Sequence, residues 1–370
     1  MTKPKRILVA PLNWGLGHAT RCIPVINELI AHNFEPIIAS DGVALALLRH
    51  EFPTLNTLTL PSYNITYAKQ GKHFKLKMIW DSPKILNTMR EEKKVIKAYV
   101  KKHQIDGIIS DNRLGVHHKQ IPCVFITHQL NVLTGNTSWI TSKIHQKIIK
   151  KFDACWVPDV SGKPNLSGKL GHLKNSNLPV AYLGALSRFE KESLPISNQL
   201  LVLLSGPEPQ RTLLADKLFV ELQNFKGNIL FIDGRIEATQ KVTEHPLPHG
   251  KLTRVNFMKS RALQDAINQS EHVLCRSGYT TVLDLAKLNK KAFFIPTPGQ
   301  YEQEYLAKRF HKKGMVPQCD QEDFTLEKLN LIADFTGLSE YHFTADYSSL
   351  FAIFSKVKEN SDPTSSTLST

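Results

Sequence analysis

The feature that most restricts the fold is an alternation of short apolar runs with amphipathic helical stretches, which occurs twice along the 370 residues. The strands predicted in the first half lie at residues 7–10, 36–39, 58–60, 107–110, 124–127 and 155–158. The pattern restarts at residues 200–204, 229–232, 272–275 and 292–295. Strands that alternate with helices form parallel sheets covered on both faces. The sequence therefore predicts an α/β protein with two units.

A polar stretch over residues 189–198 is the predicted joint between these units. It separates an N-terminal domain over 1–188 from a C-terminal domain over 199–345. A last helix is expected over 346–360, and the Ser/Thr-rich residues 361–370 are expected to be disordered.

Composition sets further limits. The net charge of +14 favours anionic partners. No apolar run approaches the ~18–20 residues that span a bilayer, and no long apolar signal segment opens the chain. The five cysteines are scattered without a CxxC pair, which is typical of reduced thiols. We therefore expect a cytoplasmic protein.

A glycine-rich turn follows the first predicted strand. Gly15 and Gly17 allow the backbone to turn tightly and to approach a ligand, and the helix start behind them favours negative charge. His18 lies at the carboxyl end of the strand, where ligands bind in such sheets, and its imidazole could take a proton from an acceptor hydroxyl. The alternatives are an ordinary strand-to-helix turn and a histidine that caps the helix.

Two further strand ends carry polar residues. Asp111 follows the strand at 107–110 and could orient His18, although an aspartate that merely ends a strand in a turn is the more common case. His128 and Asn131 follow the strand at 124–127. They could line an acceptor site or be ordinary loop residues.

The most specific pattern lies in the second half, as CRSGYTTVLD over 275–284 and PTPGQYEQEY over 296–305. Ser277 and Gly278 lead into a helix whose free N–H groups can hold a diphosphate. Asp284 follows in the first turns of that helix and can accept both ribose hydroxyls. Residues 302–304 begin another helix, where they can bind sugar hydroxyls. The alternative is two capping clusters at helix starts.

These segments resemble the donor-binding half of glycosyltransferase family 28. That family has a Cys-Arg-Ser-Gly-Ala-Leu-Thr-Val-Ser-Glu type run, an apolar strand that ends in proline, and then paired glutamines. The direct matches to the run are Ser277, Gly278, Thr281 and Val282. Asp284 stands where the family has a ribose-binding glutamate. Gln303 matches the first sugar-binding glutamine, while Glu304 replaces the second.

Other segments resemble the family in the same order. The loop with Gly17 and His18 is similar to its N-terminal glycine-rich loop and histidine. Arg188 is similar to an arginine that contacts the donor phosphate. Ser205 and Gly206 are similar to the Ser-Gly-Gly loop that opens the second domain, with Pro207 in place of the second glycine.

The resemblance implies the GT-B arrangement, in which two Rossmann-like domains face a central cleft. It also implies a UDP-sugar as co-substrate, transfer of a hexosyl or N-acetylhexosaminyl group with inversion, and no cofactor or bound metal. The donor-binding residues expected on this basis are Arg188, Ser205, Gly206, Arg276, Ser277, Gly278, Tyr279, Thr280, Asp284, Glu302, Gln303 and Glu304. The expected catalytic residues are His18 and Asp111, and the expected acceptor-binding residues are Gly15, Gly17, His128 and Asn131.

Lysines concentrate between residues 69 and 151. A helical stretch at 142–152 is expected to place Ile144, Ile148 and Phe152 on one face beside lysines, and residues 67–80 mix lysines with aromatic side chains. Such stretches suit an anionic bilayer, here the inner face of the plasma membrane, and a solvated lysine face fits equally well. Several family members use lipid-linked acceptors, which favours the membrane. No nucleic-acid motif accompanies the charge, so no nucleic-acid partner is expected.

Two other functions stay open on the sequence alone. A UDP-sugar 2-epimerase has the same two-domain architecture and needs no acceptor. A protein that keeps the fold without catalysis could be held at membranes by its basic face.

Overall fold

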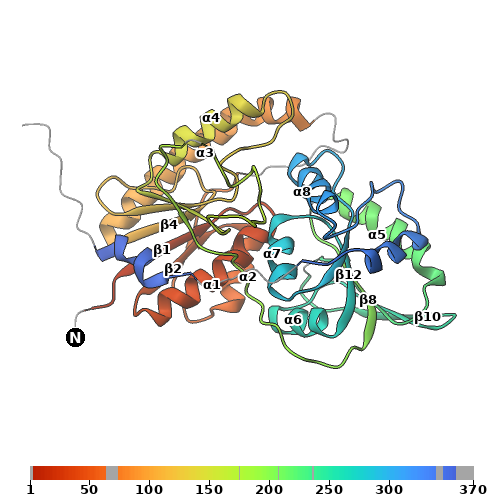
Figure 1. Ribbon diagram of the computed structural model, residues 1–370. Helices are drawn as coiled ribbons and strands as arrows, with labels where there is room; N and C mark the ends of the chain where they lie inside the picture. The colour runs from red at the N-terminus through yellow and green to blue at the C-terminus, as the bar shows by residue number, and fades with distance from the viewer. Residues whose placement is uncertain are drawn as a thin grey trace, which may run out of the picture.

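The computed structural model describes residues 3–63, 74–174, 176–206, 208–235, 237–338 and 345–355, without the side chains of 74–82. The chain builds two sheets, one in each half of the molecule, and helices flank both (Figure 1). The predicted α/β fold with two Rossmann-like domains is confirmed, and the strand order of each sheet explains how the two units meet.

The first sheet is parallel, in the order β3-β2-β1-β4-β5-β6-β7. Its strands are β1 (Arg6–Pro11), β2 (Glu35–Ser40), β3 (Thr57–Thr59), β4 (Gly107–Asp111), β5 (Cys123–Ile126), β6 (Ala154–Val157) and β7 (Val180–Tyr182). Its helices are α1 (Gly17–Ala31), α2 (Gly42–Glu51), α3 (Phe74–His103) and α4 (Ser138–Ile149). The apolar run Ile7, Leu8 and Val9 is fully buried because β1 lies centrally, with helices on both faces.

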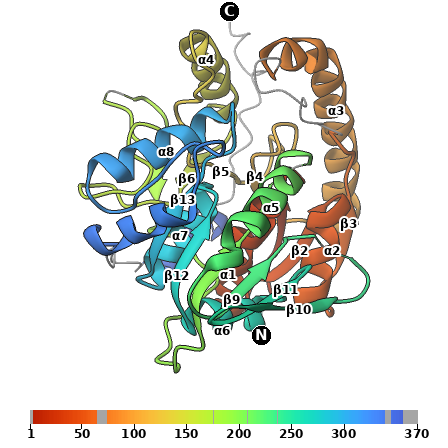
Figure 2. The ribbon, with the colours of Figure 1, turned by 90° about the vertical axis from the view of Figure 1, so that its right-hand side faces the viewer.

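The second sheet has the order β10-β11-β9-β8-β12-β13 and is parallel except for β10, which pairs antiparallel with β11 (Figure 2). Its strands are β8 (Asn198–Leu203), β9 (Ile229–Ile232), β10 (Val242–Leu247), β11 (Gly250–Val255), β12 (Ser270–Cys275) and β13 (Lys291–Phe294). Its helices are α5 (Gln210–Glu221), α6 (Ser260–Asn268), α7 (Tyr279–Lys287), α8 (Tyr301–Lys312) and the 3-10 helices η2 (Leu222–Asn224) and η3 (Leu326–Asp334). The β10–β11 hairpin is an addition to the predicted strands.

The end of the described chain returns to the first domain. The short helices α9 (Tyr347–Phe351) and η4 (Ala352–Ser355) lie beside β1 and β2 in Figure 1. The ring of Phe351 packs 5.6 Å from that of Phe34, and Lys5 Nζ donates a hydrogen bond to the Phe354 carbonyl (2.8 Å). The helix expected over 346–360 is therefore two short turns up to residue 355. Residues 356–370 lie outside the described residues.

Two local expectations about the basic stretches were wrong. The pair Ser82-Pro83 is typical of a helix start and predicts that the lysine-rich helix begins there, but α3 begins at Phe74 and Pro83 lies inside it. Phe152 does not share an exposed face with Ile144, because α4 ends at Ile149 and Phe152 then turns into the core. The basic and aromatic stretch at 67–80 lies entirely outside the described side chains. Among the described residues, no helix is long and apolar enough to cross a membrane.

The two domains meet through the starts of α1 and α7, which face one another at the centre of Figure 1. Thr280 Oγ1 donates a hydrogen bond to the Gly17 carbonyl (3.4 Å), and Tyr279 donates one to the Pro158 carbonyl (2.7 Å). A Cβ added at Gly17 would come within 2.8 Å of Thr280 Oγ1, so the close approach requires glycine there. The strand ends of the first sheet consequently face the helix starts of the second domain.

Candidate active site

A buried polar cluster lies where β4 and β5 end. Its centre is Asp111, the last residue of β4, which is fully buried. His18, at the start of α1, holds its Nδ1 2.8 Å from Asp111 Oδ1. Arg21 Nη2 lies 2.9 Å from the same nitrogen. In the tautomer that donates the Nδ1 proton to the ionised Asp111, the Nε2 lone pair of His18 is available. A carboxylate that orients a histidine in this way is the geometry of a general base.

Arg21 completes this cluster, and sequence reasoning missed it. Its side chain is 2% exposed, and its guanidinium donates from Nε and Nη2 to both oxygens of Asp111. Its Nη1 donates to His128 Nδ1 at 3.0 Å. The available signal was a basic residue three positions after His18, a spacing that puts both side chains on the same face of a helix.

The charges in the cluster favour a neutral base. Burial is the largest influence on His18 and lowers its pKa; Asp111 opposes this, and Arg21 reinforces it. Burial would raise the pKa of Asp111, but Arg21 and His18 outweigh it and hold that pKa well below the ordinary range. At neutral pH the cluster therefore contains an ionised carboxylate beside a neutral imidazole that can accept a proton.

Glu302, on α8 of the second domain, reaches across to the first domain. Its Oε1 lies 3.2 Å from His128 Nε2, and its Oε2 accepts a hydrogen bond from Gln129. The His128 ring is stacked on Tyr279 with the ring centroids 4.2 Å apart. Glu302 and Tyr279, which the resemblance assigned to the donor, thus contact the expected acceptor-binding residue. Gln129 was not among the predicted site residues.

A second polar group surrounds Arg188 and Asp284. Ser187 donates a hydrogen bond to Asp284 Oδ1 (2.7 Å), and Arg188 donates one to Ser260 Oγ (2.9 Å). Ser260 in turn donates to Glu51 of α2, in the first domain. Burial raises the pKa of Asp284 to about 6, although Arg188 and Ser187 act in the opposite direction. Among the described residues, the buried Nε of Arg188 has no hydrogen-bond partner.

Three of the predicted donor-binding side chains are used inside the second domain. Arg276 is 1% exposed and donates to the carbonyls of Ile295 and Pro296, among other partners. Ser277 donates to the Gln303 carbonyl, while Gln303 Oε1 accepts the backbone N–H of residue 297. These contacts shape the loops after β12 and β13, so they support the helix starts rather than project into the interface.

Other predicted residues lie nearer to solvent. Ser205 and Gly206 are exposed in the loop after β8. Gly15 turns with a φ of 76° and has open space around it. Asn131 donates to the Lys169 carbonyl (2.6 Å) and so ties two loops of the first domain together.

The remaining predicted donor-binding residues lie at the start of α7 and in the first turn of α8. Gly278 precedes α7 as its N-cap, which leaves the first-turn N–H groups of that helix without helical partners. Glu304 accepts the Gly299 N–H (2.9 Å) and lines a pocket beside α8. Among the described residues, no group of three or more His, Cys, Asp or Glu side chains is placed to hold a metal ion.

Comparisons with known proteins give this geometry a context. Residues 211–334 match the glycosyltransferase family 28 C-terminal domain. The chain is 26% identical over 262 residues to the UDP-N-acetylglucosamine–N-acetylmuramyl-(pentapeptide) pyrophosphoryl-undecaprenol N-acetylglucosamine transferase of Pasteurella multocida, a match that spans 66% of each chain. It is 25% identical over 278 residues to the enzyme of the same name from Actinobacillus pleuropneumoniae, spanning 69% of this chain and 71% of that one.

Solved structures share the fold at low sequence identity. MurG of Acinetobacter baumannii aligns with a TM-score of 0.55 at 14% identity, over 95% of this chain and 100% of that one. The glycosyltransferase SnogD from Streptomyces nogalater aligns with a TM-score of 0.61 at 14% identity, over 96% of each chain. Both are GT-B glycosyltransferases, which confirms the predicted fold. Residues 211–334 therefore match the C-terminal domain of glycosyltransferase family 28, and the chain has the two-domain GT-B fold.

Proposed function

We propose that the protein is a glycosyltransferase that moves a hexosyl or N-acetylhexosaminyl group from a UDP-sugar to an acceptor hydroxyl with inversion. The observation that carries the proposal is the His18–Asp111 pair, with 2.8 Å between Nδ1 and Oδ1 at the edge where the two domains meet. The relatives described above are named as transferases of N-acetylglucosamine from UDP-N-acetylglucosamine, and another structural neighbour was solved with UDP. Both observations favour a UDP-sugar donor.

In the proposed reaction, the acceptor oxygen attacks the anomeric carbon of the donor while His18 Nε2 takes the hydroxyl proton. The bond between the anomeric carbon and the diphosphate oxygen breaks, and UDP leaves with that electron pair. Attack from the face opposite to the leaving group inverts the anomeric centre. Asp111 stabilises the imidazolium that forms, and Arg21 keeps Asp111 ionised throughout.

The donor is proposed to lie on the second domain. The open N–H groups at the start of α7 suit the diphosphate, because a helix start attracts negative charge. Arg188 has an unused buried N–H donor near Asp284, and we assign this pair to the phosphate and the ribose of the donor. Glu304 is the sugar-binding side chain that faces open space, whereas Gln303 acts by holding the loop.

A lipid-linked acceptor and peripheral contact with an anionic membrane belong to the same proposal. Three large apolar side chains of α4 lie in solvent: Trp139 is 62% exposed, Ile140 44% and Ile144 58%. Lys143 Nζ lies 5.2 Å from the Trp139 ring centroid. An exposed apolar face with lysine beside it is suited to an anionic bilayer surface.

The test is a screen of UDP-sugars by thermal unfolding, followed by release of UDP in the presence of lipid-linked and soluble acceptors. A donor at about 100-fold its dissociation constant should add about 2.7 kcal/mol to the free energy of unfolding. Incubation with UDP-N-acetylglucosamine alone separates the competing function, since a 2-epimerase would isomerise the sugar without any acceptor. Absence of UDP binding by calorimetry would exclude both functions.

A further inference from the structure

A second buried guanidinium of the first domain belongs to Arg113, two residues after Asp111. Its Nη1 donates to Asp41 Oδ1 and its Nε to Glu92 Oε1, both at 2.7 Å. Its Nη2 donates to the Pro61 carbonyl, and both carboxylates are themselves buried. One guanidinium therefore ties together the carboxyl ends of β2 and β4 and the middle of α3.

The carboxylate of Asp41 is not used in the way that its position favours. Asp41 is the N-cap of α2, where an aspartate usually accepts a backbone N–H of the first turn, yet its side chain accepts none from this described helix. Its Oδ2 instead accepts a hydrogen bond from Asn13 Nδ2 (3.0 Å). Asn13 Oδ1 accepts the Ala44 N–H (3.3 Å). Asn13 therefore caps α2 in place of Asp41, and Asp41 joins Asn13 to Arg113.

The start of α2 leaves room for this contact. Gly42, the first residue of the helix, has a φ of 50°, in the left-handed region that favours glycine. A Cβ added at Gly42 would overlap Asn13 Nδ2. The hydrogen bond between Asn13 and Asp41, which lie 28 residues apart, consequently depends on glycine at position 42.

These contacts close a ring that contains the candidate base. Asn13 begins the loop that leads to His18, and His18 contacts Asp111. Arg113 lies two residues after Asp111. Its contact with Asp41 leads back to Asn13. A closed ring of covalent and hydrogen-bonded links restricts the places that the imidazole can occupy.

The two covalent parts of the ring differ in how they are held. In the turn over 111–113, Ser110 Oγ donates to the Arg113 carbonyl (2.7 Å), and Asn112 has a φ of 57°, which asparagine adopts more readily than most residues. In the loop over 14–17, Gly15 turns with a φ of 76° in open space. The position of this loop therefore depends on how its ends are held, and Asn13 holds the first of them.

The exact place of the imidazole matters because two partners compete for one nitrogen. His18 Nδ1 lies 2.8 Å from Asp111 Oδ1 and 2.9 Å from Arg21 Nη2. Donation to Asp111 places the proton on Nδ1 and leaves Nε2 able to accept. Acceptance from Arg21 places the proton on Nε2 and removes the base. Since the two partners are almost equally close, a small displacement of the ring changes the balance between the tautomers.

We propose that Asn13 is a positioning residue for the candidate base. Held by Asp41, it keeps His18 where Nδ1 donates to Asp111 and Nε2 can accept a proton. The inference rests on the proposed function, which requires that lone pair, and it assigns a role to the loop that precedes the base.

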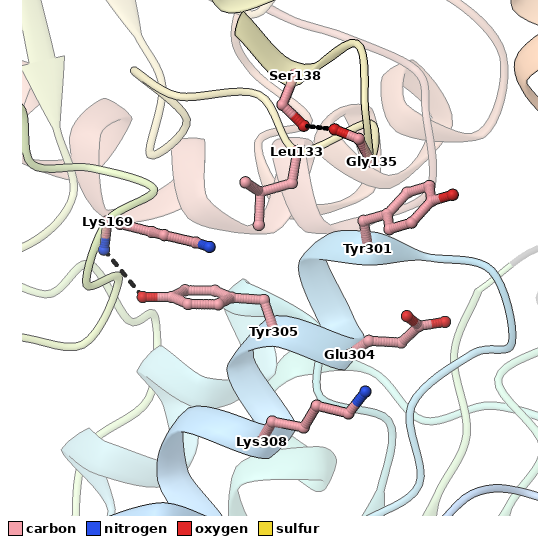
Figure 3. Close-up of a pocket in the computed structure, with 8 residues that line it drawn as sticks. All are labelled: Leu133, Gly135, Ser138, Lys169, Tyr301, Glu304, Tyr305 and Lys308. Atoms are coloured by element: carbon pink, nitrogen blue, oxygen red, sulfur yellow. Dashed lines mark hydrogen bonds between the residues drawn. The ribbon is translucent and has the colours of Figure 1, made fainter.

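The ring of contacts lies apart from the residues proposed to bind the donor. Figure 3 shows Glu304, the proposed sugar-binding residue, at a pocket between α8 and the loop that precedes α4. The lining of that pocket, as the structure describes it, includes no member of the ring. A change at Asn13 should therefore displace His18 and leave donor binding unaltered, whereas a purely structural role would affect both.

The experiment measures the tautomer of His18 by nitrogen NMR on the full-length protein with labelled histidines. The pH is set above the pKa of His18, where its ring is neutral, and His18→Gln identifies the signal. In the unmodified protein we expect the proton on Nδ1. Asn13→Ala should move the population toward a proton on Nε2 and lower kcat for UDP release by roughly 10–100-fold, since a misplacement of about 1 Å can cost about 100-fold. Calorimetry should show unchanged affinity for UDP.

A matched control and an exchange of partners make the result specific. Asn87→Ala removes an exposed asparagine of the same domain that donates to Glu91 (2.8 Å), and it should change neither the tautomer nor kcat. Asn13→Asp sets two carboxylates against each other and should act as Asn13→Ala does. Asn13→Asp combined with Asp41→Asn again places a donor opposite an acceptor, and it should recover most of the Nδ1 tautomer and of kcat.

Gly42→Ala tests the same contact from the other side, because the added methyl group displaces Asn13, and it should shift the tautomer in the same direction. An unchanged tautomer in Asn13→Ala, an equal shift in Asn87→Ala, or a loss of UDP affinity together with kcat would overturn the proposal. If the tautomer shifts as expected in a protein that releases no UDP from any donor, the proposed function fails while the positioning role of Asn13 stands.

Discussion

The carboxylate of Glu302, on α8 of the second domain, lies 3.2 Å from Nε2 of His128, at the end of β5 in the first. His128 accepts a hydrogen bond from Arg21, which is bound to Asp111. Asp111 is thereby linked to the second domain through a series of polar contacts that passes by way of Arg21 and His128. Burial opposes ionisation of Glu302, but His128, Arg21 and His18 outweigh it and lower its pKa. The second domain therefore contributes a negative charge to the cluster.

Glu302→Gln is expected to loosen this contact between the domains. The amide keeps a hydrogen-bonding group but lacks the charge, so we expect a loss of about 1–2 kcal/mol, or roughly tenfold in kcat/KM. Small-angle X-ray scattering with UDP should show a larger radius of gyration than for the unmodified protein. Glu322→Gln changes an exposed carboxylate of the same domain and should leave both measurements unaltered. A variant that closes and reacts normally would show that the contact is incidental.

His18→Gln should remove the proposed general base. We expect kcat to fall by roughly 10²–10⁴-fold, the usual contribution of such a group, with the affinity for UDP unchanged. Transfer is measured as UDP release, and donor binding by calorimetry. His50→Gln replaces an exposed histidine of α2 and serves as the control. Equal loss of UDP affinity and of kcat would indicate a structural role for His18.

Arg21→Gln should shift the pH dependence of the reaction. Arg21 lowers the pKa of His18 in addition to burial, while Asp111 raises it. Removing the guanidinium takes away one of the influences that lower the pKa of His18, while burial continues to lower it, so this pKa rises and the acid limb of kcat/KM moves to higher pH. Asp111 would also lose its buried counterion, at a cost of about 3–5 kcal/mol in stability.

Arg21→Lys distinguishes the loss of the positive charge from the loss of the guanidinium geometry, which Arg21→Gln removes together. It keeps the positive charge and loses the forked contact with Asp111. Its acid limb should therefore lie nearer that of the unmodified protein than the limb of Arg21→Gln. A profile that does not move in either variant would mean that His18 is not the titrating group.

Asp284→Asn should stabilise the ligand-free protein while weakening its binding of UDP. The folded pKa of about 6 exceeds the ordinary value of about 4, so the folded state holds the proton more tightly than the unfolded state. Stability consequently falls as the pH rises from about 4 to about 6 and stays lower above that range. The substitution should add roughly 1–3 kcal/mol at about pH 7.5 and little near pH 4. Denaturant unfolding at both values checks this, and equal destabilisation at both would contradict it.

Trp139→Ser with Ile144→Ser should weaken binding to vesicles that contain anionic lipid. The two side chains are 62% and 58% exposed, and burial of a large apolar side chain contributes about 1.5–3 kcal/mol. We expect a loss of roughly tenfold or more in vesicle sedimentation. Val220→Ser, a 71% exposed residue of α5, is the matched control. If this control weakens binding equally, α4 is not the membrane contact.

The sequence alone determined the two α/β units and the place of His18, Asp111 and His128 at strand ends. The reason is local: an apolar run with polar residues after it defines a buried strand and its end, and in parallel sheets those ends share one edge. The match at 275–284 likewise identified the helix start at Gly278. Each of these features depends on residues close together in the chain.

The tertiary structure decided which side chains of that edge contact one another. Asp111 and Arg21 are 90 residues apart, and Glu302 reaches Gln129 across 173 residues. Such contacts depend on how strands are ordered in a sheet and how one domain is set against the other, and no local periodicity encodes either. The same holds for Arg276, whose buried guanidinium donates to the carbonyls of Ile295 and Pro296, 19 and 20 residues further along the chain. Burial in the folded chain, and not the residue type, assigns these side chains their partners.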